Sequence, residues 1–522
     1  MKTALIQPPV WGVYDPPAGL AQISGYLKKF GCEVDVFDLN IEFYRSRKQE
    51  YNSMWAIEQS SFWTNNDNVN KYFNDNSALV NAWVDKIAAG EPGLVGISVN
   101  VCSLHPALKI AGMLKKKLPN VKIAAGGPMF CVPADVGVIL NDSPIDIVVY
   151  GEGEQTFKEL ACIMNAGGSP DSCRGIYLKK EGSIFKTDTM PPLKNLDELP
   201  YLDFCGFPAE KYDPPGHLGE HISLMTSRGC VQQCVFCGPK AYWPGYRTMG
   251  GKRIYDEICH HLRTFPLTAH IEFLDLLFNG SMNTLNEFCG LMISSPPKAG
   301  LKWHANLIIR PEMTDTVFLK MKSSGCEHVT YGIESGSQRV LDHMRKRYRV
   351  EDADRVLRSA HGAGIQVTCN FMFGFPGETN EDFGATLSFL ERNAAYIDTA
   401  YPSRTFFTIE PHSYLESHLK EFEIVPNSEH GQYWVSSDGR NDYPERMKRC
   451  EEFSKRAISL GVNVGLGLQT SVELDRWFNL GNYYEMIKDY KNALISYNNY
   501  LKLDPHNAVI NSRYDLLKQK KH

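Results

Sequence analysis

Short apolar runs alternate with helical patterns in two long stretches of this chain of 522 residues. The first stretch covers residues 1–150, and its runs have the continuous apolar character of buried parallel strands. The pattern restarts at Ile222, and further candidate strands follow at residues 271–274, 301–306, 328–332, 366–373 and 405–409. Repeated βα units predict an α/β protein, with an open parallel sheet first and a full or partial parallel barrel second.

A chain of this length exceeds one hydrophobic core, and the patterns divide it into three predicted domains. Residues 1–190 are expected to form a Rossmann-like, doubly wound parallel sheet, with residues 41–86 as a helical insertion. Residues 191–425 are expected to form the TIM-type barrel. Beyond residue 426 helical periodicity replaces the strands, which predicts a small all-α region. Residues 474–507 match one copy of the tetratricopeptide pattern, and we interpret them as a helical hairpin packed on the barrel.

Composition limits the partners and the compartment. The formal charge of -5, from 55 basic and 60 acidic residues, gives no electrostatic case for nucleic acid as the main partner. No apolar run approaches the ~20 residues that a membrane-spanning helix requires. Most cysteines are scattered singly and no secretory signal precedes them, so we expect a reduced, cytoplasmic protein.

Three cysteines with close spacing carry the strongest chemical signal. Cys230, Cys234 and Cys237 form a CxxxCxxC run directly after the first predicted barrel strand, where barrel enzymes place their chemistry. Three thiolates can hold three irons of a 4Fe-4S cluster and leave the fourth iron open to a small chelating molecule. The same spacing also allows a structural zinc site with one histidine. The candidate fourth zinc ligands are His221, His260 and His261.

The cysteine spacing, with an aromatic residue directly before the third cysteine, resembles the radical S-adenosylmethionine (SAM) enzymes. In these enzymes the open iron is chelated by SAM, and reductive cleavage yields a 5′-deoxyadenosyl radical. The resemblance extends from Ile222 to about Leu415 and includes a GIESGS segment and a GFPGET turn. It implies SAM contacts at Phe236, Asp275, Arg310, Glu334, Ser335, Gly374 and Pro376.

Each of these SAM-binding candidates has a simpler structural role as an alternative. Asp275 and Glu334 can cap strand ends, and Arg310 can form a surface ion pair. The glycines of both segments can serve ordinary turns. The resemblance rests on their order behind the cysteine run.

A Rossmann-like sheet followed by a radical SAM barrel resembles the cobalamin-dependent class of this superfamily. The resemblance implies cobalamin contacts at the carboxyl ends of the strands, where open parallel sheets bind ligands. The candidates are Pro8, Ser98, Asn100, Ser103, Leu104, Gly126, Gly127, Gly151 and Glu152. The DxHxxG run that supplies an axial histidine in many cobalamin mutases is absent. His105 is a candidate in its place, although its position before Pro106 favours a helix-start or surface role.

The resemblance implies a methyltransferase. Hydrogen abstraction by the 5′-deoxyadenosyl radical would be followed by methyl transfer from methylcobalamin to an unactivated carbon or phosphorus. Three alternatives stay open: cyclisation, rearrangement or oxidation without methyl transfer, a radical SAM enzyme that has lost the corrin, and a zinc-binding interaction scaffold. A reducing partner such as flavodoxin or ferredoxin is expected. The substrate is not predicted beyond a small metabolite or a peptide or protein side chain, and no catalytic side chain is predicted.

Overall fold

The structure is a computed structural model that describes residues 1–56, 59–130, 136, 139–141, 143–180, 182–212, 220–403, 406–425, 431–465, 470–505 and 507–520. The chain forms two compact units. The first unit contains residues 1–229, 241–275 and 283–303, and the second contains residues 230–240, 276–282 and 304–522.

The first unit is built on a sheet whose strands follow the order β2-β1-β3-β4-β5-β6-β7. Strands β1 to β5 pair in parallel, and β6 and β7 continue the sheet antiparallel. The strands are β1 (Lys2–Gln7), β2 (Glu33–Asp38), β3 (Leu94–Ser98), β4 (Lys122–Gly126), β5 (Ile147–Val149), β6 (Ile176–Lys180) and β7 (Ser183–Lys186). The chain reverses its direction of progress between β1 and β3, and ligands of open α/β sheets bind at such a switch point.

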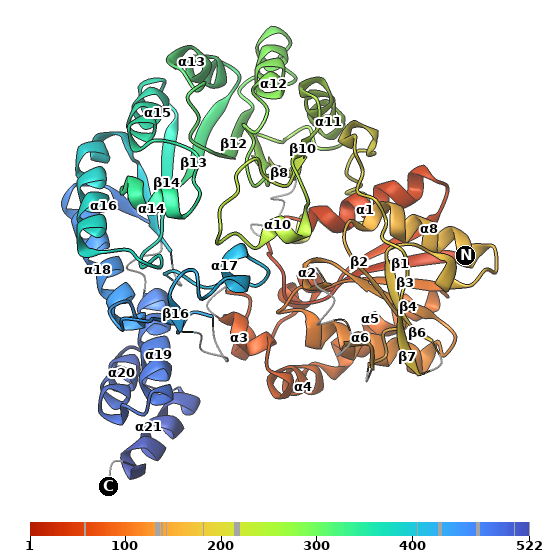
Figure 1. The fold of residues 1–522 in the computed structure, drawn as a ribbon. Helices are drawn as coiled ribbons and strands as arrows, with labels where there is room; N and C mark the ends of the chain where they lie inside the picture. Colours follow the sequence, from red (N-terminus) through yellow and green to blue (C-terminus); the bar gives the residue numbers. More distant parts are fainter. Residues whose placement is uncertain are drawn as a thin grey trace. The chain divides into compact units, whose positions relative to one another are not determined.

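Helices cover both faces of this sheet (Figure 1). Helices α1 (Ala18–Lys29) and α8 (Gly153–Asn165) pack together on one face. The other face buries alternate strand residues against α5 (Ser77–Ala89) and α6 (Leu104–Lys117). This two-residue alternation places Ala4 in that core.

The segment between β2 and β3 folds into helices in its described residues. They are α2 (Leu39–Arg45), α3 (Ser60–Trp63), α4 (Asn66–Asp75) and α5. Their core is aromatic: Trp63 and Tyr72 are fully buried, with ring centroids 5.2 Å apart. Aromatic pairs at this separation contribute about 0.5–1.5 kcal/mol beyond the buried area.

The first unit also contains the beginning of the barrel. Strands β8 (His221–Leu224) and β11 (His270–Phe273) pair in parallel, and α11 (Gly251–Thr264) connects toward β11. A two-stranded antiparallel pair, β9 (Ser227–Arg228) and β10 (Arg247–Thr248), follows β8. Helix α12 (Met282–Ser294) then leads to β12 (Lys302–Leu307), whose first two residues belong to this unit.

The second unit continues the parallel βα repeats in the strand order β18-β15-β14-β13-β12. Its other strands are β13 (Cys326–Glu334), β14 (Gln366–Phe371), β15 (Thr399–Pro402) and β18 (Asn463–Val464). Its helices are α13 (Asp315–Ser323), α14 (Gln338–His343), α15 (Val350–Gly362), α16 (Asn380–Asn393), α17 (Tyr414–Ser417) and α18 (Tyr443–Ser459). The short strands β16 (Ile424–Val425) and β17 (Val435–Ser436) pair antiparallel, and α10 (Pro239–Tyr242) follows the cysteine run.

The last three helices are α19 (Thr470–Met486), α20 (Tyr490–Leu503) and α21 (Ala508–Lys520). Gly481 of α19 lies against Tyr497 of α20, and an added Cβ would overlap the tyrosine ring. The glycine of the tetratricopeptide-like pattern therefore serves helix packing. The assignment of a tetratricopeptide repeat stays a prediction.

The α/β fold class with parallel sheets and a helical C-terminal region is confirmed, whereas two local expectations are wrong. Of the predicted strand at residues 405–409, Thr405 lies outside the described residues and residues 406–409 are not in a strand. The strand is β15, which ends at Pro402. Phe406 and Phe407 are apolar because they are buried in the loop that follows it. Strands also continue beyond residue 426, as β17 and β18.

The predicted domain boundaries at residues 190 and 425 stay predictions. Among the described residues, no helix has the length and apolarity needed to cross a bilayer.

Candidate active site

The two residues before the cysteine run, Arg228 and Gly229, form its stem, which lies against a neighbouring turn. Gly229 has a φ of 77°, and a Cβ there would overlap the carbonyl oxygen of Gly245. Only glycine combines this left-handed backbone with so close an approach. The stem before Cys230 is thereby fixed against the turn that precedes β10.

The cysteine run itself is anchored by Val235, which is fully buried in the second unit. Its N–H donates to the carbonyl of Met344 at 3.1 Å, and its carbonyl accepts from the N–H of Leu415 at 2.9 Å. The three cysteine side chains around it are half-buried. The loop is thus fixed by its backbone, and the thiols need no packing role.

A buried lysine lies beside these thiols. Lys346 Nζ donates to Glu334 Oε1 at 2.9 Å and to the carbonyl of Gly332 at 2.7 Å. Burial disfavours its charge, but Glu334 and Cys234 hold the pKa of Lys346 above its usual value. Burial raises the pKa of Cys234 to about 11, and Lys346 opposes that rise. The structure therefore brings the predicted SAM residue Glu334 and the cysteine run to one cationic group, which the sequence reasoning missed.

Aromatic rings connect the cysteine run with the GFPGET turn. Phe236 lies 6.3 Å from Phe407, and Phe407 lies 5.1 Å from Phe375, measured between ring centroids. Phe375 stands between the predicted SAM residues Gly374 and Pro376. The structure thus connects Phe236 and the turn, which were both predicted to contact SAM. Phe407, which joins them, was missed because it was assigned to a strand.

Helix α18 and the segment just before it hold the GFPGET turn. The N–H of Gly374 donates to Glu378 Oε2 at 2.7 Å, and Arg449 Nη1 contacts the same oxygen at 2.7 Å. Asn441 donates to the carbonyl of Gly374 at 3.0 Å. Burial raises the pKa of Glu378, and Arg449 opposes this shift. Sequence reasoning missed Arg449 and Asn441, which lie about 70 residues away in the chain with no local signal.

The remaining SAM-binding candidates already have protein partners. Ser335 is buried, and its hydroxyl contacts Thr386 of α16 at 3.1 Å. Arg310 donates to the carbonyls of Asn279 and Gly280 at 2.9 Å each and pairs with Glu312 at 3.0 Å. The Arg310 pair agrees with the ion-pair alternative, and a SAM contact at either residue stays a prediction.

Asp275 closes the end of β8 in the first unit. Its carboxylate accepts from the backbone N–H and the hydroxyl of Thr226, both at 2.9 Å, and from the N–H of Ser227. Burial raises the pKa of Asp275 to about 6, although these hydrogen bonds oppose the shift. This is the strand-end role considered for Asp275, and its contact with SAM stays a prediction.

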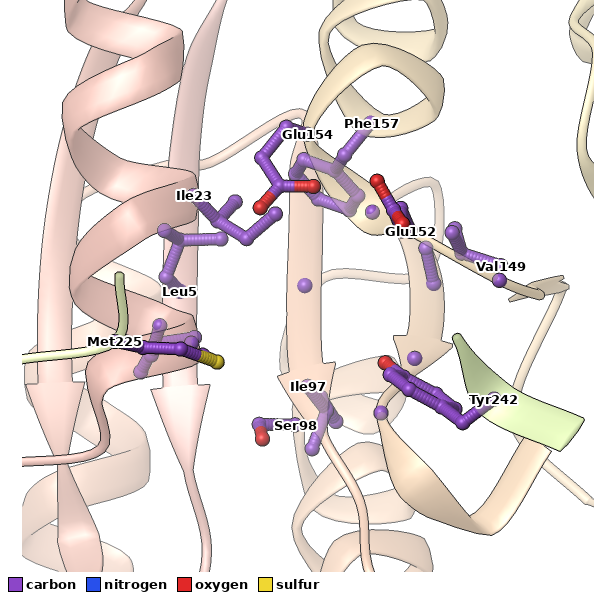
Figure 2. Close-up of a pocket in the computed structure, with 18 of the residues that line it drawn as sticks. Leu5, Ile23, Ile97, Ser98, Val149, Glu152, Glu154, Phe157, Met225 and Tyr242 are labelled. Atoms are coloured by element: carbon purple, nitrogen blue, oxygen red, sulfur yellow. The ribbon is translucent and has the colours of Figure 1, made fainter. Parts of the chain in front are cut away.

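A cavity of about 140 Å³ lies at the carboxyl ends of the strands of the first sheet (Figure 2). Its walls come from β1, β3, β4 and β5 and from α1 and α8, with Leu5, Ile23 and Phe157 among the apolar side chains. A Cβ at Gly96 would come within 2.6 Å of Phe157. Gly127 has a φ of 115°, and a Cβ there would lie 2.7 Å from the carbonyl oxygen of Val99. A side chain at Gly96 would therefore displace the cavity wall, whereas Gly127 is required by the backbone conformation at the end of β4.

Five of the predicted cobalamin residues line this cavity: Ser98, Gly126, Gly127, Gly151 and Glu152. The other four, Pro8, Asn100, Ser103 and Leu104, are not among its lining residues. Asn100 and Ser103 bond to each other, the Ser103 N–H donating to Asn100 Oδ1 at 2.9 Å, which shapes the turn before α6. His105 Nε2 lies 3.1 Å from the carbonyl oxygen of Thr64, in agreement with a surface role.

Two carboxylates at the cavity belong to a buried ion network. Arg228 Nη1 donates to Glu152 at 2.7 Å, and its other terminal nitrogen pairs with Glu154. Arg247 also pairs with Glu152 and donates to the carbonyl of Leu193 at 2.6 Å. Burial alone would raise the pKa of Glu152, but Arg247 and Arg228 hold it below its usual value. Neither arginine was among the predicted site residues, and of the two glutamates only Glu152 was.

The three histidines considered as zinc ligands have other neighbours. His221 Nδ1 lies 3.2 Å from Asp15, and His261 Nε2 lies 3.1 Å from Glu257. The ring of His260 stacks on Tyr201, with centroids 4.4 Å apart.

Comparison with known proteins decides the family. Residues 224–390 match the model of the radical SAM superfamily. Over 345 residues the chain is 30% identical to an uncharacterized methyltransferase of Pyrococcus horikoshii, an alignment that covers 65% of this chain and 70% of that protein. This chain belongs to the radical SAM superfamily. A radical SAM enzyme holds an iron–sulfur cluster, which favours the enzyme over the zinc-binding scaffold. The assignment of the three clustered cysteines as cluster ligands stays a prediction.

Other relatives of this radical SAM enzyme differ in activity. It is 25% identical to the anaerobic magnesium-protoporphyrin IX monomethyl ester cyclase of Rubrivivax gelatinosus over 317 residues, 58% of this chain and 54% of the cyclase. Its fold is similar to that of the radical SAM methyltransferase TsrM from Kitasatospora setae, solved with cobalamin and a [4Fe-4S] cluster. The TM-score is 0.60 at 16% identity, over 88% of each chain. The resemblance in fold to cobalamin-dependent radical SAM enzymes is thereby confirmed.

Proposed function

We propose that this protein is a cobalamin-dependent radical SAM enzyme that transfers a methyl group to an unactivated carbon or phosphorus of its substrate. The observation that carries the proposal is the glycine-lined cavity at the strand ends of the first sheet, on the same chain as a radical SAM cysteine run. The fold of TsrM, a methyltransferase solved with cobalamin and a cluster, supports it.

The residues present fit an iron–sulfur cluster. Cys230, Cys234 and Cys237 are three soft ligands on a loop whose backbone is fixed through Val235. The N–H of Gln232 donates to Cys230 Sγ at 3.3 Å, the kind of bond that tunes cluster sulfurs. A cluster bound there would deliver an electron to SAM, whose cleavage gives a radical able to remove a substrate hydrogen.

The first sheet fits a corrin cofactor. The cavity is mainly apolar, opens at the switch-point end of the sheet and is kept free of side chains by Gly96, Gly126 and Gly127. Such a space suits a flat ring of a nucleotide tail. Phe157 closes it on one side. A corrin bound at this sheet would supply the methyl carrier that an inert carbon requires.

The protein's own residues would orient the cofactors and exclude water from the reaction. Lys346 places a positive charge beside the cysteine run and holds Glu334 at the end of β13. The rings of Phe236, Phe407 and Phe375 form a continuous apolar contact from that run to the GFPGET turn. We further propose that a flavodoxin or ferredoxin supplies the electrons, because among the described residues no second run of clustered cysteines is present.

A labelled methyl group tests the proposal. The enzyme, purified without oxygen and loaded with cobalamin, is incubated with SAM that carries a deuterated methyl group and with a reductant. Recovery of the deuterated methyl in the corrin fraction, analysed by mass spectrometry, supports methyl transfer. A corrin that gains no label while SAM is cleaved to 5′-deoxyadenosine contradicts it.

The second candidate is radical chemistry without methyl transfer. It is favoured by the relative from Rubrivivax gelatinosus, which is a cyclase. The two candidates differ in the fate of the methyl group, since the cyclase-type reaction leaves it on the methionine released from SAM.

A further inference from the structure

The buried ion network of Glu152, Glu154, Arg228 and Arg247 joins two places that the proposed function uses separately. Glu152 lies in the turn between β5 and α8 and Glu154 lies in the first turn of α8, and both line the cavity. Arg228 lies in β9, also lines the cavity, and stands two residues before Cys230. The wall of the cavity and the stem of the cysteine run therefore share side chains.

The three central members of the network are almost fully buried. The side chains of Arg228, Glu152 and Glu154 are 6%, 9% and 7% exposed. Two guanidinium groups balance two carboxylates, and burial without this balance would strongly disfavour each charge. If Arg228 moves away from Glu154, that buried carboxylate loses its paired guanidinium, which ties a shift of the turn to the stem.

The stem has little freedom to absorb such a shift. Arg228 and Arg247 lie opposite each other in the antiparallel strands β9 and β10. The side chain of Arg247 forms an ion pair with the same Glu152. Gly229, the next residue, is fixed in a left-handed conformation against Gly245. The chain continues from this held stem directly into Cys230.

We propose that this network couples occupancy of the cavity to the position of the cysteine run, so that corrin and cluster affect each other's affinity. The inference rests on the proposed function. Arg228 and Glu154 act as positioning residues, through the turn on one side and the stem on the other. Coupling between two sites is reciprocal and typically changes an affinity by about 5- to 150-fold.

The test measures hydroxocobalamin affinity by absorbance titration, in protein with a reconstituted cluster and in protein stripped of iron by an anaerobic chelator. The ratio of the two dissociation constants is the coupling. Glu154→Gln keeps the size of the side chain and removes its charge. The matched control is Glu159→Gln, on the same helix α8, which breaks a solvent-exposed pair with Arg174.

For the wild type and Glu159→Gln we expect a ratio of about fivefold or more, and for Glu154→Gln a ratio near one. If Glu154→Gln does not fold, Arg228→Lys replaces it, since lysine keeps the charge and loses the two-pronged donor. Coupling that survives in the variant, or a wild-type ratio of one, overturns the inference while corrin binding stands. A wild type that binds no corrin overturns the proposed function as well, and the two failures are thereby distinct.

Discussion

Breaking the buried pair of Arg449 and Glu378 should loosen the GFPGET turn. The side chains are 6% and 1% exposed, and their atoms lie 2.7 Å apart. Arg449→Met leaves the Glu378 carboxylate buried without its partner, which costs about 3–5 kcal/mol for pairs of this kind. The same carboxylate accepts the N–H of Gly374, so the cost falls on the turn itself.

The assay is native-state hydrogen exchange of the peptide that contains residues 373–379, read by mass spectrometry. A loss of about 3–5 kcal/mol in local stability corresponds to exchange about two to four orders of magnitude faster. The matched control is Arg456→Met on the same helix. Arg456 pairs with Glu391, and both side chains are about half exposed, at 51% and 42%. A surface pair of this kind contributes about 0–1 kcal/mol.

We expect SAM affinity, measured by equilibrium dialysis, to fall in Arg449→Met and to stay unchanged in Arg456→Met. Arg449→Met combined with Glu378→Gln removes the unpaired charge and should recover most of the protection. Exchange in Arg449→Met as slow as in the control would refute the argument that this pair holds the turn.

Three further perturbations test other parts of the account. Gly19→Leu on α1 should abolish hydroxocobalamin binding by filling the cavity. Gly19→Ala should still bind it, because the added Cβ would meet nothing within 4 Å. Equal binding of the two variants in titrations would contradict the assigned site. Asp275 has its pKa raised by burial to about 6 in the folded state, so its contribution to stability is complete below pH ~4 and is lost as the pH rises through about 6. Asp275→Asn should flatten the fall of the melting temperature between pH 4 and 6, and an unchanged slope would remove Asp275 as its source. Lys346→Met should lower the midpoint potential of the reconstituted cluster in a redox titration followed by electron paramagnetic resonance, since it removes a positive charge near Cys234; a potential equal to that of the wild type would contradict this placement.

The sequence was most informative where the signal is local. The cysteine run, the glycines at strand ends and the alternation of βα units depend on short-range spacing, and they located the sheets and five residues of the cavity wall. Glu152 shows the limit: its position at a strand end was predicted, but its partners Arg228 and Arg247 lie 76 and 95 residues away. Such pairings depend on tertiary packing, which one sequence does not encode in any local pattern.

A run of apolar residues did not distinguish a strand from a buried loop. The segment around Phe406 and Phe407 has the composition of a strand, yet it is a buried loop with Phe406 at a φ of 57°. Burial in a loop and burial in a strand select the same residue types. Arg310 and Ser335 show the converse, because residues that match a ligand-binding pattern can already bond to neighbouring backbone or side chains.

Metal analysis tests the central claim most directly. The protein is purified without oxygen from cells supplied with cobalamin, its absorbance spectrum is recorded, and its iron, cobalt and zinc are quantified beside Cys230→Ala and the exposed-cysteine control Cys205→Ser. The account predicts about four irons and one cobalt per chain in the wild type and in Cys205→Ser, and loss of the iron in Cys230→Ala. Iron without cobalt would contradict the corrin, and zinc in place of iron would contradict the radical chemistry.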